Sequence, residues 1–233
     1  MVLMDLSAWG SPRVLERLGG GHRNEVFRVA GDLVARRSRR SAASLDWELD
    51  LLDHLHHNDF VIAEVAPARD GRRHVDGVVV QRWLPGYAPT TDDWPLVAAE
   101  LHRLHTLLGR WPQRPDFRST RDLLATDRGG DVDLTAMPDA AVTACRAAWS
   151  ALTGPETVIH GDPCTANLRI HHGRVGFLDW DEARVDHPWL DLADLPNSTL
   201  PPTAKAAVDA WEAANAWLLE PDYARDRLAA LTG

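Results

Sequence analysis

The strongest constraint on the fold is a polar loop that interrupts β-prone sequence in the second half of the 233-residue chain. Thr157–His160 and Leu168–His171 have strand-like composition, and the turn-forming tetrapeptide HGDP, with the residues after it, separates them. A third β-prone run, Val175–Asp179, follows a His-Gly turn and ends in a carboxylate. Because these short strands lie among segments with helical periodicity, the sequence predicts an α+β fold.

Three oxygen-bearing side chains are carried by this part of the chain. Asp162 and Asn167 lie on the loop itself, and Asp179 closes the hairpin that follows, so the three can meet at one point. Hard cations such as Mg²⁺ prefer oxygen ligands and keep water and phosphate oxygens in their remaining positions. Asn167 and Asp179 therefore suit a metal ion, which leaves Asp162 to accept a proton. Each residue alone is also an ordinary turn former, so the interpretation depends on the complete set.

The first 86 residues predict a small antiparallel sheet with one helix. Leucines at helical spacing predict the helix over 41–57. A strand is predicted before the glycines at 19–21, and the other β-prone runs are Glu25–Val29, Leu33–Arg37, Val61–Val65 and Val75–Trp83. After the sequence LPG at 84–86 the pattern is mainly helical, and it predicts helices over Trp94–Leu108, 139–152 and 203–219.

On the predicted helix over 41–57, Glu48 lies on or beside the stripe of leucines that faces the core. A buried carboxylate needs a partner, because an isolated charge is costly to remove from water. Arg36 and Arg37, at the end of the preceding strand, are the nearest cations, and the alternation of that strand does not decide between them. The alternative is a partly exposed Glu48 whose side chain reaches water.

Three consecutive glycines, Gly19, Gly20 and Gly21, precede a predicted strand. Such a segment either forms a flexible turn or lets backbone N–H groups approach phosphate oxygens. The sequence lacks the G-x-x-x-x-G-K-[ST] pattern of a P-loop, and no dinucleotide-binding fingerprint leads from a strand into a helix.

The surplus of acidic residues lies entirely in the second half of the chain. Residues 1–86 contain 12 Arg and 12 Asp or Glu, whereas 87–233 contain 13 basic and 22 acidic residues. This charge favours a cationic partner and disfavours nucleic acid, although acidity that only keeps the protein soluble is the alternative. No apolar run approaches the ~20 residues that span a bilayer, and no secretory leader pattern opens the chain. We therefore expect a cytoplasmic protein with no membrane partner.

The motifs together resemble those of the aminoglycoside phosphotransferase and choline kinase group of small-molecule kinases, which share the protein-kinase-like fold. The resemblance lies in HGD with Asn167, then in LDW at 178–180 and DLA at 191–193. In the first half, LGGGHRNEVFRV is similar to the family's glycine-rich nucleotide loop, LVARR to its third strand, VVVQRWLPG to its hinge and LHRLH to the next helix. Nearly the whole chain is covered in the same order. The resemblance implies a bilobal α+β fold, with a β-rich nucleotide-binding N-lobe over 1–86 and a helical C-lobe with the catalytic loop and acceptor site over 87–233.

The resemblance also implies roles for residues of the catalytic loop. Asp162 would be the catalytic base that orients the acceptor hydroxyl, and His160 would shape the loop rather than transfer protons. Asn167 and Asp179 would hold Mg²⁺ on the nucleotide phosphates. Asp191 would brace the catalytic loop.

Nucleotide contacts follow in the same way. The glycine loop with Gly20 and Gly21 would cover the phosphates of ATP or GTP, and Arg36, paired with Glu48, would replace the family's phosphate-binding lysine. The hinge backbone at Gln81 and Trp83 would meet the edge of the base, with the nucleotide bound between the lobes. The role of Asp181 and Glu182 rests on charge and not on the resemblance: these acids, just past Asp179, favour a cationic acceptor.

Two features depart from the family pattern. Arg36 has a planar, forked guanidinium where the family has a compact lysine ammonium, so the phosphate geometry could differ. The chain ends about thirty residues after the helix that begins near Thr203, so the substrate-binding part looks short. A substrate-binding part this short indicates either a small acceptor or an open site.

The implied function is transfer of the γ-phosphoryl group of a nucleoside triphosphate to a hydroxyl of a small molecule. The acidic C-lobe favours a cationic antibiotic such as an aminoglycoside, which is the antibiotic-resistance type of activity. The alternatives are a kinase of an amino alcohol, sugar, nucleoside or macrolide, and a non-catalytic kinase-like nucleotide-binding protein. A metal-dependent hydrolase using the same carboxylates is a further class, but it leaves the glycine turn, Glu48 and the hinge unexplained. The sequence predicts neither the choice between ATP and GTP as phosphoryl donor nor the oligomeric state.

Two other candidate sites are set aside on the sequence. His102 and His105 are interpreted as surface residues of a helix, because no third metal ligand is suggested nearby. Cys164, within the catalytic loop, is interpreted as a small filler because it has no obvious base partner.

Overall fold

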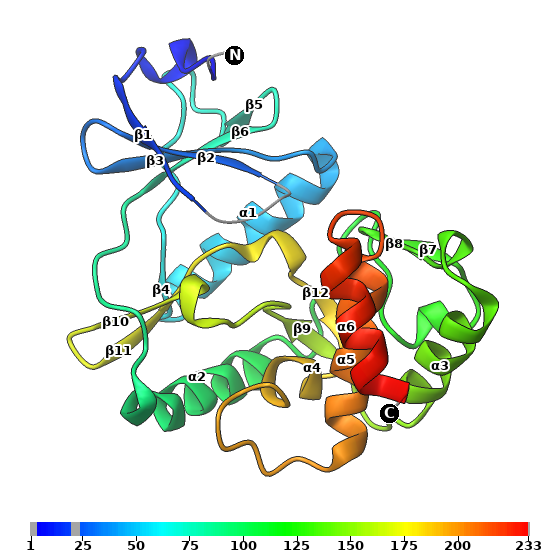
Figure 1. Cartoon of the computed structure of the whole chain (residues 1–233). Helices are drawn as coiled ribbons and strands as arrows, with labels where there is room; N and C mark the ends of the chain where they lie inside the picture. Colours follow the sequence, from blue (N-terminus) through cyan, green and yellow to red (C-terminus); the bar gives the residue numbers. More distant parts are fainter. Residues whose placement is uncertain (1–3, 20–23, 233) are drawn as a thin grey trace. The chain divides into compact units, whose positions relative to one another are not determined.

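The computed structural model describes residues 4–19 and 24–232. Over these residues the fold is α+β, as predicted, with a β-sheet in the N-terminal region and helices in the C-terminal region (Figure 1). The chain divides into two compact units: Met1–Ala88 with Leu168–Leu178, and Pro89–Asn167 with Asp179–Gly233. The hairpin over 168–178, which the sequence analysis assigned to the region 87–233, therefore belongs to the first unit.

A five-stranded antiparallel sheet, in the order β1-β2-β3-β6-β5, forms most of the first unit. Asp76 and Gly77 have φ of 49° and 76°, so the run predicted as one strand from Val75 folds instead into a hairpin with a tight turn. The predicted strands at 25–29 and 33–37 are confirmed. The strands are β1 (Val14–Arg17), β2 (Glu25–Val29), β3 (Leu33–Arg37), β5 (His74–Val75) and β6 (Val78–Arg82).

The predicted helix of the first unit is confirmed as α1 (Ala42–His57). It begins after Ser41, whose hydroxyl oxygen accepts a hydrogen bond from the Ser44 N–H at 3.3 Å and so satisfies one of the free amides of the first turn. The leucine stripe of the helix is buried, and Glu48 on the same helix is only 1% exposed.

A second, three-stranded sheet completes the first unit. The hairpin of β10 (Leu168–His171) and β11 (Arg174–Phe177) pairs in parallel with β4 (Val61–Ile62). The strand predicted over Val61–Val65 is therefore short, and it lies outside the five-stranded sheet. Gly176 allows the close approach of Leu84 and of Val61 on β4, because a Cβ there would lie 2.7 Å and 3.2 Å from their side chains.

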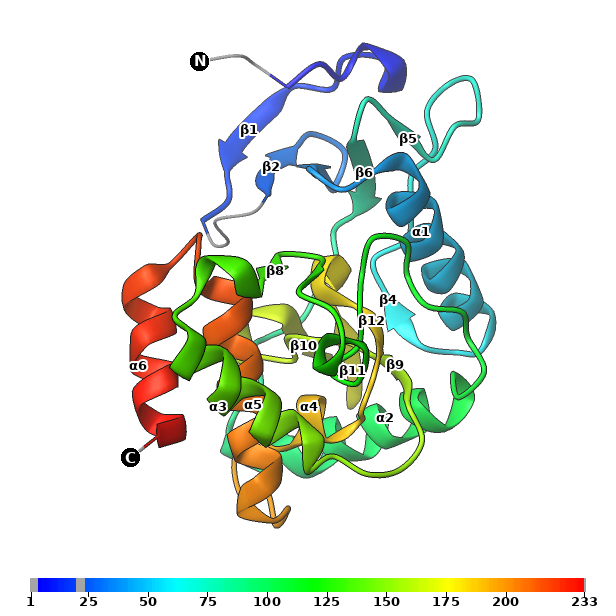
Figure 2. The same ribbon diagram turned by 90° about the vertical axis from the view of Figure 1, so that its right-hand side faces the viewer.

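Helices dominate the second unit, and Figures 1 and 2 both show α6 running along α5. Trp149 and Trp211 are buried in its apolar core. The helices are α2 (Trp94–Leu107), α3 (Asp139–Ser150), α4 (Trp189–Leu192), α5 (Pro202–Ala216) and α6 (Pro221–Thr232), with a small hairpin of β7 (Arg128–Gly129) and β8 (Val132–Asp133). Among the described residues, no helix combines the length and apolar character needed to cross a membrane.

The strand that leads into the loop of the HGD motif, β9 (Thr157–Ile159), pairs with β12 (Arg184–Asp186) and not with β10. The sequence pattern did not predict which strand β9 pairs with, whereas the predicted hairpin of the two strands after the loop is confirmed. Gly161, just after β9, has φ of 92° and turns the chain away from the line of the strand. The short β12 was not predicted, since a run of three residues with two charges has no strand pattern.

Candidate active site

The loop after β9 is built on the residues His160 and Gly161. The His160 side chain is fully buried, and its ring centroid lies 4.7 Å from that of Trp180. A Cβ at Gly161 would lie 2.5 Å from the Glu182 carbonyl oxygen, so only glycine fits at this close approach. The Asp162 N–H donates a hydrogen bond to Nδ1 of His160 at 3.3 Å. These contacts fix the backbone that carries the Asp162 carboxylate.

The structure brings the predicted pair Asp162 and Asn167 together. Nδ2 of Asn167 donates to Oδ2 of Asp162 at 2.8 Å and to the Asp162 carbonyl oxygen at 3.1 Å. A 3₁₀ turn over Thr165–Asn167 places the amide there. Because Nδ2 of Asn167 is hydrogen-bonded to Asp162, the amide oxygen, Oδ1, points away from Asp162.

Asp179 is the first residue of the second unit after the hairpin and has an exposed side chain. Its backbone is left-handed, with φ of 53° and ψ of 72°, a conformation that Asp tolerates better than most residues. Trp180, the next residue, packs on His160 and so ties this turn to the catalytic loop.

Asn167 and Asp179 have the chemistry that suits a hard divalent cation, because together they would offer one amide oxygen and one carboxylate. Within residues 4–19 and 24–232, no group of three or more His, Cys, Asp or Glu side chains is arranged as a metal site. An ion held by this pair would take its remaining ligands from water and phosphate oxygens, which is the usual situation of Mg²⁺.

Asp191, on α4, anchors the candidate catalytic loop. Its carboxylate accepts hydrogen bonds from the His160 N–H and the Gly161 N–H, both at 2.8 Å, and from Nε2 of His105 at 2.9 Å. Burial alone would raise the pKa of Asp191, but the hydrogen bond from His105, the charges of His105 and His160, and the Gly161 amide hold it below its ordinary value. The buried residue is therefore an ionised carboxylate.

The sequence interpretation of His105 as a surface residue is wrong. The side chain is 9% exposed on α2 and is bonded to Asp191. The signal was its position four residues after Leu101, which puts it on the buried face of the helix. His102, by contrast, lies on the exposed side, where Nδ1 bonds to the Ala98 carbonyl oxygen at 2.7 Å.

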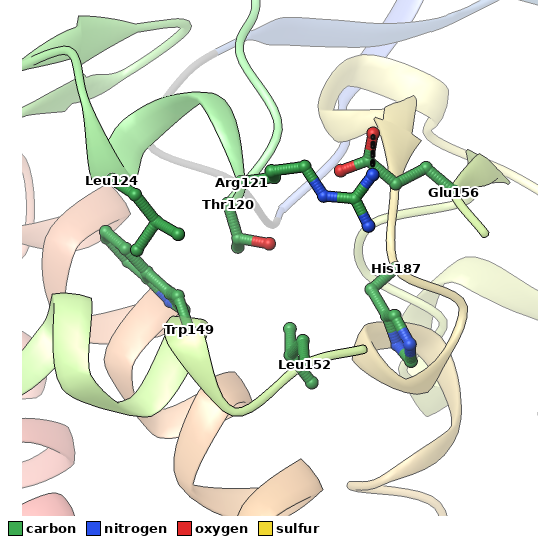
Figure 3. A pocket seen from close by; sticks show the side chains of 7 residues that line it. All are labelled: Thr120, Arg121, Leu124, Trp149, Leu152, Glu156 and His187. Carbon is green, nitrogen blue, oxygen red and sulfur yellow. Dashed lines mark ion pairs between the residues drawn. The ribbon is translucent and has the colours of Figure 1, made fainter. Parts of the chain in front are cut away.

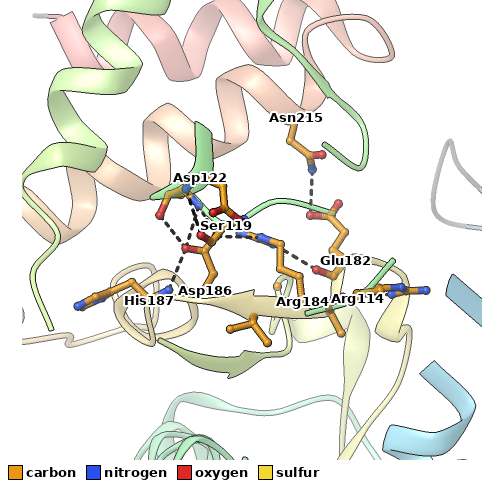
Figure 4. Close-up of polar contacts among 12 residues, drawn as sticks. Arg114, Ser119, Asp122, Glu182, Arg184, Asp186, His187 and Asn215 are labelled. Carbon is orange, nitrogen blue, oxygen red and sulfur yellow. Dashed lines mark hydrogen bonds and ion pairs between the residues drawn. The ribbon is translucent and has the colours of Figure 1, made fainter. Parts of the chain in front are cut away.

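The two predicted acceptor residues after Asp179 lie in different surroundings. Asp181 is 4% exposed. Glu182 is half-buried, and its Oε2 accepts a hydrogen bond from Nδ2 of Asn215 on α5 at 2.9 Å (Figure 4). Of the two carboxylates, Glu182 is the more open to a ligand.

A third carboxylate of this region, Glu212 on α5, was missed by the sequence analysis. It is half-buried, and Tyr223 on α6 donates its hydroxyl to Oε2 at 3.1 Å. Burial raises the pKa of Glu212, and the negative charges of Asp162 and Asp194 raise it further, against the lowering effect of Arg227. Arg227 itself pairs with Asp194 at 2.7 Å. Glu212 thus lies within electrostatic range of the Asp162 carboxylate.

In the first unit, the structure shows which arginine is the partner of Glu48. Arg36 on β3 is 6% exposed and donates from Nη2 to Oε1 of Glu48. Arg37 lies on the other face of the strand, 3.8 Å from Glu25. Arg36 and not Arg37 therefore makes the buried ion pair.

The predicted hinge residues lie at the end of β6, the strand that pairs with β3: Gln81 is on the strand and Trp83 directly follows it. The Trp83 N–H donates to the Asp32 carbonyl oxygen at 2.8 Å, and the Arg28 guanidinium stacks 3.8 Å from the centre of the half-exposed Trp83 ring. Nε2 of Gln81 donates to the Ala63 carbonyl oxygen at 3.1 Å. A base contact at this segment would use backbone groups other than the Trp83 N–H. The predicted phosphate-loop residues Gly20 and Gly21 lie outside the described residues.

A small cavity of about 40 Å³, open to solvent, lies at the end of the β9–β12 ladder opposite His160. Figure 3 shows the side chains that line it. Glu156, on its wall, has a pKa raised by burial and lies 3.8 Å from Arg121. The lining residues are Thr120, Arg121, Leu124, Trp149, Leu152, Glu156 and His187. None of the predicted site residues lines this cavity.

Comparison with known protein families gives one match to the sequence. The sequence model of a family described as "Phosphotransferase enzyme family" matches residues 14–230. No curated protein sequence matches the chain.

Among solved structures, several kinases have similar folds. A microcompartment-associated aminopropanol kinase has a TM-score of 0.64 at 18% identity, covering 97% of this chain and 92% of its own. The GDP complex of wild-type aminoglycoside 2'-phosphotransferase-IIIa has a TM-score of 0.60 at 15% identity, with 95% and 92% covered. Amicoumacin kinase hAmiN, in complex with AMP-PNP, Ca²⁺ and Ami, has a TM-score of 0.61 at 16% identity, with 93% and 79% covered. These similarities show a common fold.

Proposed function

The chain belongs to the phosphotransferase enzyme family, and we propose that it transfers the γ-phosphoryl group of a nucleoside triphosphate to a hydroxyl of a small molecule. The observation that carries this proposal is the pair of Asp162 and Asn167 on a loop anchored by the buried Asp191. A carboxylate held in this way is suited to orient an attacking hydroxyl.

In the proposed reaction Asp162 is the catalytic base. Its Oδ2 accepts the Asn167 amide at 2.8 Å, so the side chain has a fixed orientation in which the carboxylate would accept the hydroxyl proton. The bond that forms joins the acceptor oxygen to the γ-phosphorus, and the bond that breaks releases the nucleoside diphosphate. His160 supports the loop, because its Nδ1 already accepts the Asp162 N–H.

Asn167 and Asp179 are the residues proposed to hold Mg²⁺, which when bound neutralises charge on the phosphate oxygens. Arg36, oriented by its ion pair with Glu48, is proposed to contact the phosphates together with the loop at Gly20 and Gly21. ATP and GTP both remain candidate donors.

The acceptor is proposed to carry an ammonium group, as aminoglycosides and amino alcohols do. Glu182 and Glu212 support this class, since they are half-buried carboxylates in the unit that holds Asp162, and the Asp162 charge acts on Glu212. A bound cation would relieve the repulsion among these carboxylates. Asp181 is a weaker candidate because it is 4% exposed.

The test of this function is an acceptor screen with either ATP or GTP and Mg²⁺. Release of nucleoside diphosphate would be measured for amine-bearing and neutral hydroxyl compounds, and mass spectrometry would locate the added phosphate. We expect acceptor-dependent release with at least one amine-bearing compound and none without acceptor. Nucleotide binding with no transfer to any acceptor would support the non-catalytic alternative.

We expect Glu212→Gln to raise the KM for an amine-bearing acceptor about tenfold, because the amide cannot pair with an ammonium as a carboxylate does. The KM for the nucleotide should not change. Glu156→Gln is the matched control, since Glu156 is also half-buried with a pKa raised by burial, but lines the cavity at the other end of the ladder. An unchanged acceptor KM in Glu212→Gln would remove Glu212 from the acceptor site.

A further inference from the structure

The backbone just after Asp179 is held by two buried arginines. Nη1 of Arg114 donates to the carbonyl oxygens of residues 180, 181 and 183, at 2.9, 3.1 and 3.2 Å. Nη1 of Arg184 donates to the carbonyl oxygen of Glu182 at 3.1 Å (Figure 4). Four successive carbonyl groups, from 180 to 183, therefore each accept a hydrogen bond from a guanidinium group. We call Arg114 and Arg184 the guanidinium pair.

Arg184 is itself fixed on three sides. Its side chain is fully buried, Nε donates to Oδ2 of Asp186 at 3.0 Å, and the guanidinium lies 3.3 Å from the centre of the Trp211 ring on α5. Asp186 in turn accepts the Thr120 hydroxyl at 2.6 Å. The planar fork of arginine makes the carboxylate, carbonyl and ring contacts together, which the single ammonium of a lysine cannot do.

The segment held by the guanidinium pair also touches the catalytic loop. The Glu182 carbonyl oxygen that accepts from Arg184 is the atom that a Cβ at Gly161 would approach to 2.5 Å. Trp180, whose carbonyl oxygen accepts from Arg114, packs on His160. Movement of this segment would therefore shift the start of the catalytic loop and the Asp179 turn together.

Burying two guanidinium groups is costly, and replacing buried charges with apolar residues is often neutral or stabilising for a fold. We propose that Arg114 and Arg184 are positioning residues for the metal site: they fix the 180–183 backbone so that the Asp179 carboxylate is held for the divalent cation. This inference rests on the proposed function, because it takes Asp179 as a metal ligand.

The experiment measures how strongly Mg²⁺ increases the affinity for a non-hydrolysable nucleoside triphosphate, as the ratio of affinities with Mg²⁺ and with EDTA. Arg184→Lys and Arg114→Lys should each lower this ratio about tenfold, the size of one lost hydrogen bond to a charged group. The affinity in EDTA should stay near that of the unaltered protein. A partly unfolded variant would lose affinity equally in both conditions, so the ratio separates positioning from destabilisation.

Arg121→Lys is the control, since Arg121 is an exposed arginine of the same unit whose Nη2 also donates to a backbone carbonyl, that of Gly154, at 2.7 Å. Its ratio should equal that of the unaltered protein. Unchanged ratios in both Arg184→Lys and Arg114→Lys would overturn the positioning role while leaving the proposed function intact. Failure of the unaltered protein to bind nucleotide with Mg²⁺ would overturn the proposed function and this inference with it.

Discussion

Replacement of Asp162 by alanine should lower the turnover of phosphoryl transfer by roughly 100- to 10,000-fold, the range that a positioned general base contributes. The affinity for the nucleotide should be retained, because Asp162 is proposed to contact the acceptor hydroxyl and not the donor phosphates. Turnover would be measured at saturating acceptor, and nucleotide affinity by calorimetry on the same preparation. The variant also removes the carboxylate that accepts the Asn167 amide, so its thermal unfolding would be recorded as well.

Asp179→Ala is the contrasting variant for this experiment. It should weaken nucleotide binding in the presence of Mg²⁺ and leave binding in EDTA unchanged, because its proposed partner is the cation. Near-normal turnover in Asp162→Ala would exclude this residue as the base. The same pattern of loss in both variants would mean that Asp162 and Asp179 act on one ligand and do not have separate roles.

The parts of the site that the sequence predicted are those where the interacting residues are close along the chain. Asp162 and Asn167 lie on one loop of turn formers, and their hydrogen bond needs only that loop. Glu48 was predicted to need an arginine because helical geometry put it on the apolar stripe. The choice of Arg36 over Arg37 required the register of β3, which the alternation of that strand did not reveal.

Contacts between distant segments could not be predicted in the same way. The hydrogen bond from His105 to Asp191 joins residues 86 positions apart, and only the helical position of His105 hinted at its burial. β9 pairs with β12, a strand too short to have a periodic pattern, so the sequence did not reveal the partner of the strand before the loop. Glu212 lies on an alanine-rich helix, where nothing nearby in the sequence marks one carboxylate as special.

Asp191 is a residue whose replacement should cost the fold much of its stability. We expect Asp191→Asn to lower the free energy of unfolding by about 3–5 kcal/mol, the cost of breaking a buried charged interaction. The carboxylate accepts from His105 and from the amides of His160 and Gly161, whereas an amide has one oxygen and would turn its own N–H groups towards donors. Denaturant unfolding followed by circular dichroism gives the value.

Asp194→Asn is the matched control for this measurement. Asp194 lies three residues further along and pairs with Arg227 at 2.7 Å, but its side chain is 39% exposed. A surface ion pair of this kind contributes at most about 1 kcal/mol. A loss below that size in Asp191→Asn would show that the anchor contributes little to the stability of the fold.

The pH dependence of stability follows from the same carboxylate. The folded-state pKa of Asp191 lies below the unfolded value, which is about 3.9. Its contribution to the free energy of unfolding is therefore fully present above about pH 4 and is lost as the pH falls through the folded pKa. We expect the difference in stability between the unaltered protein and Asp191→Asn to be constant near neutral pH and to shrink in acid. A difference that stayed constant into strong acid would mean that Asp191 stabilises the loop by shape and not by its charge.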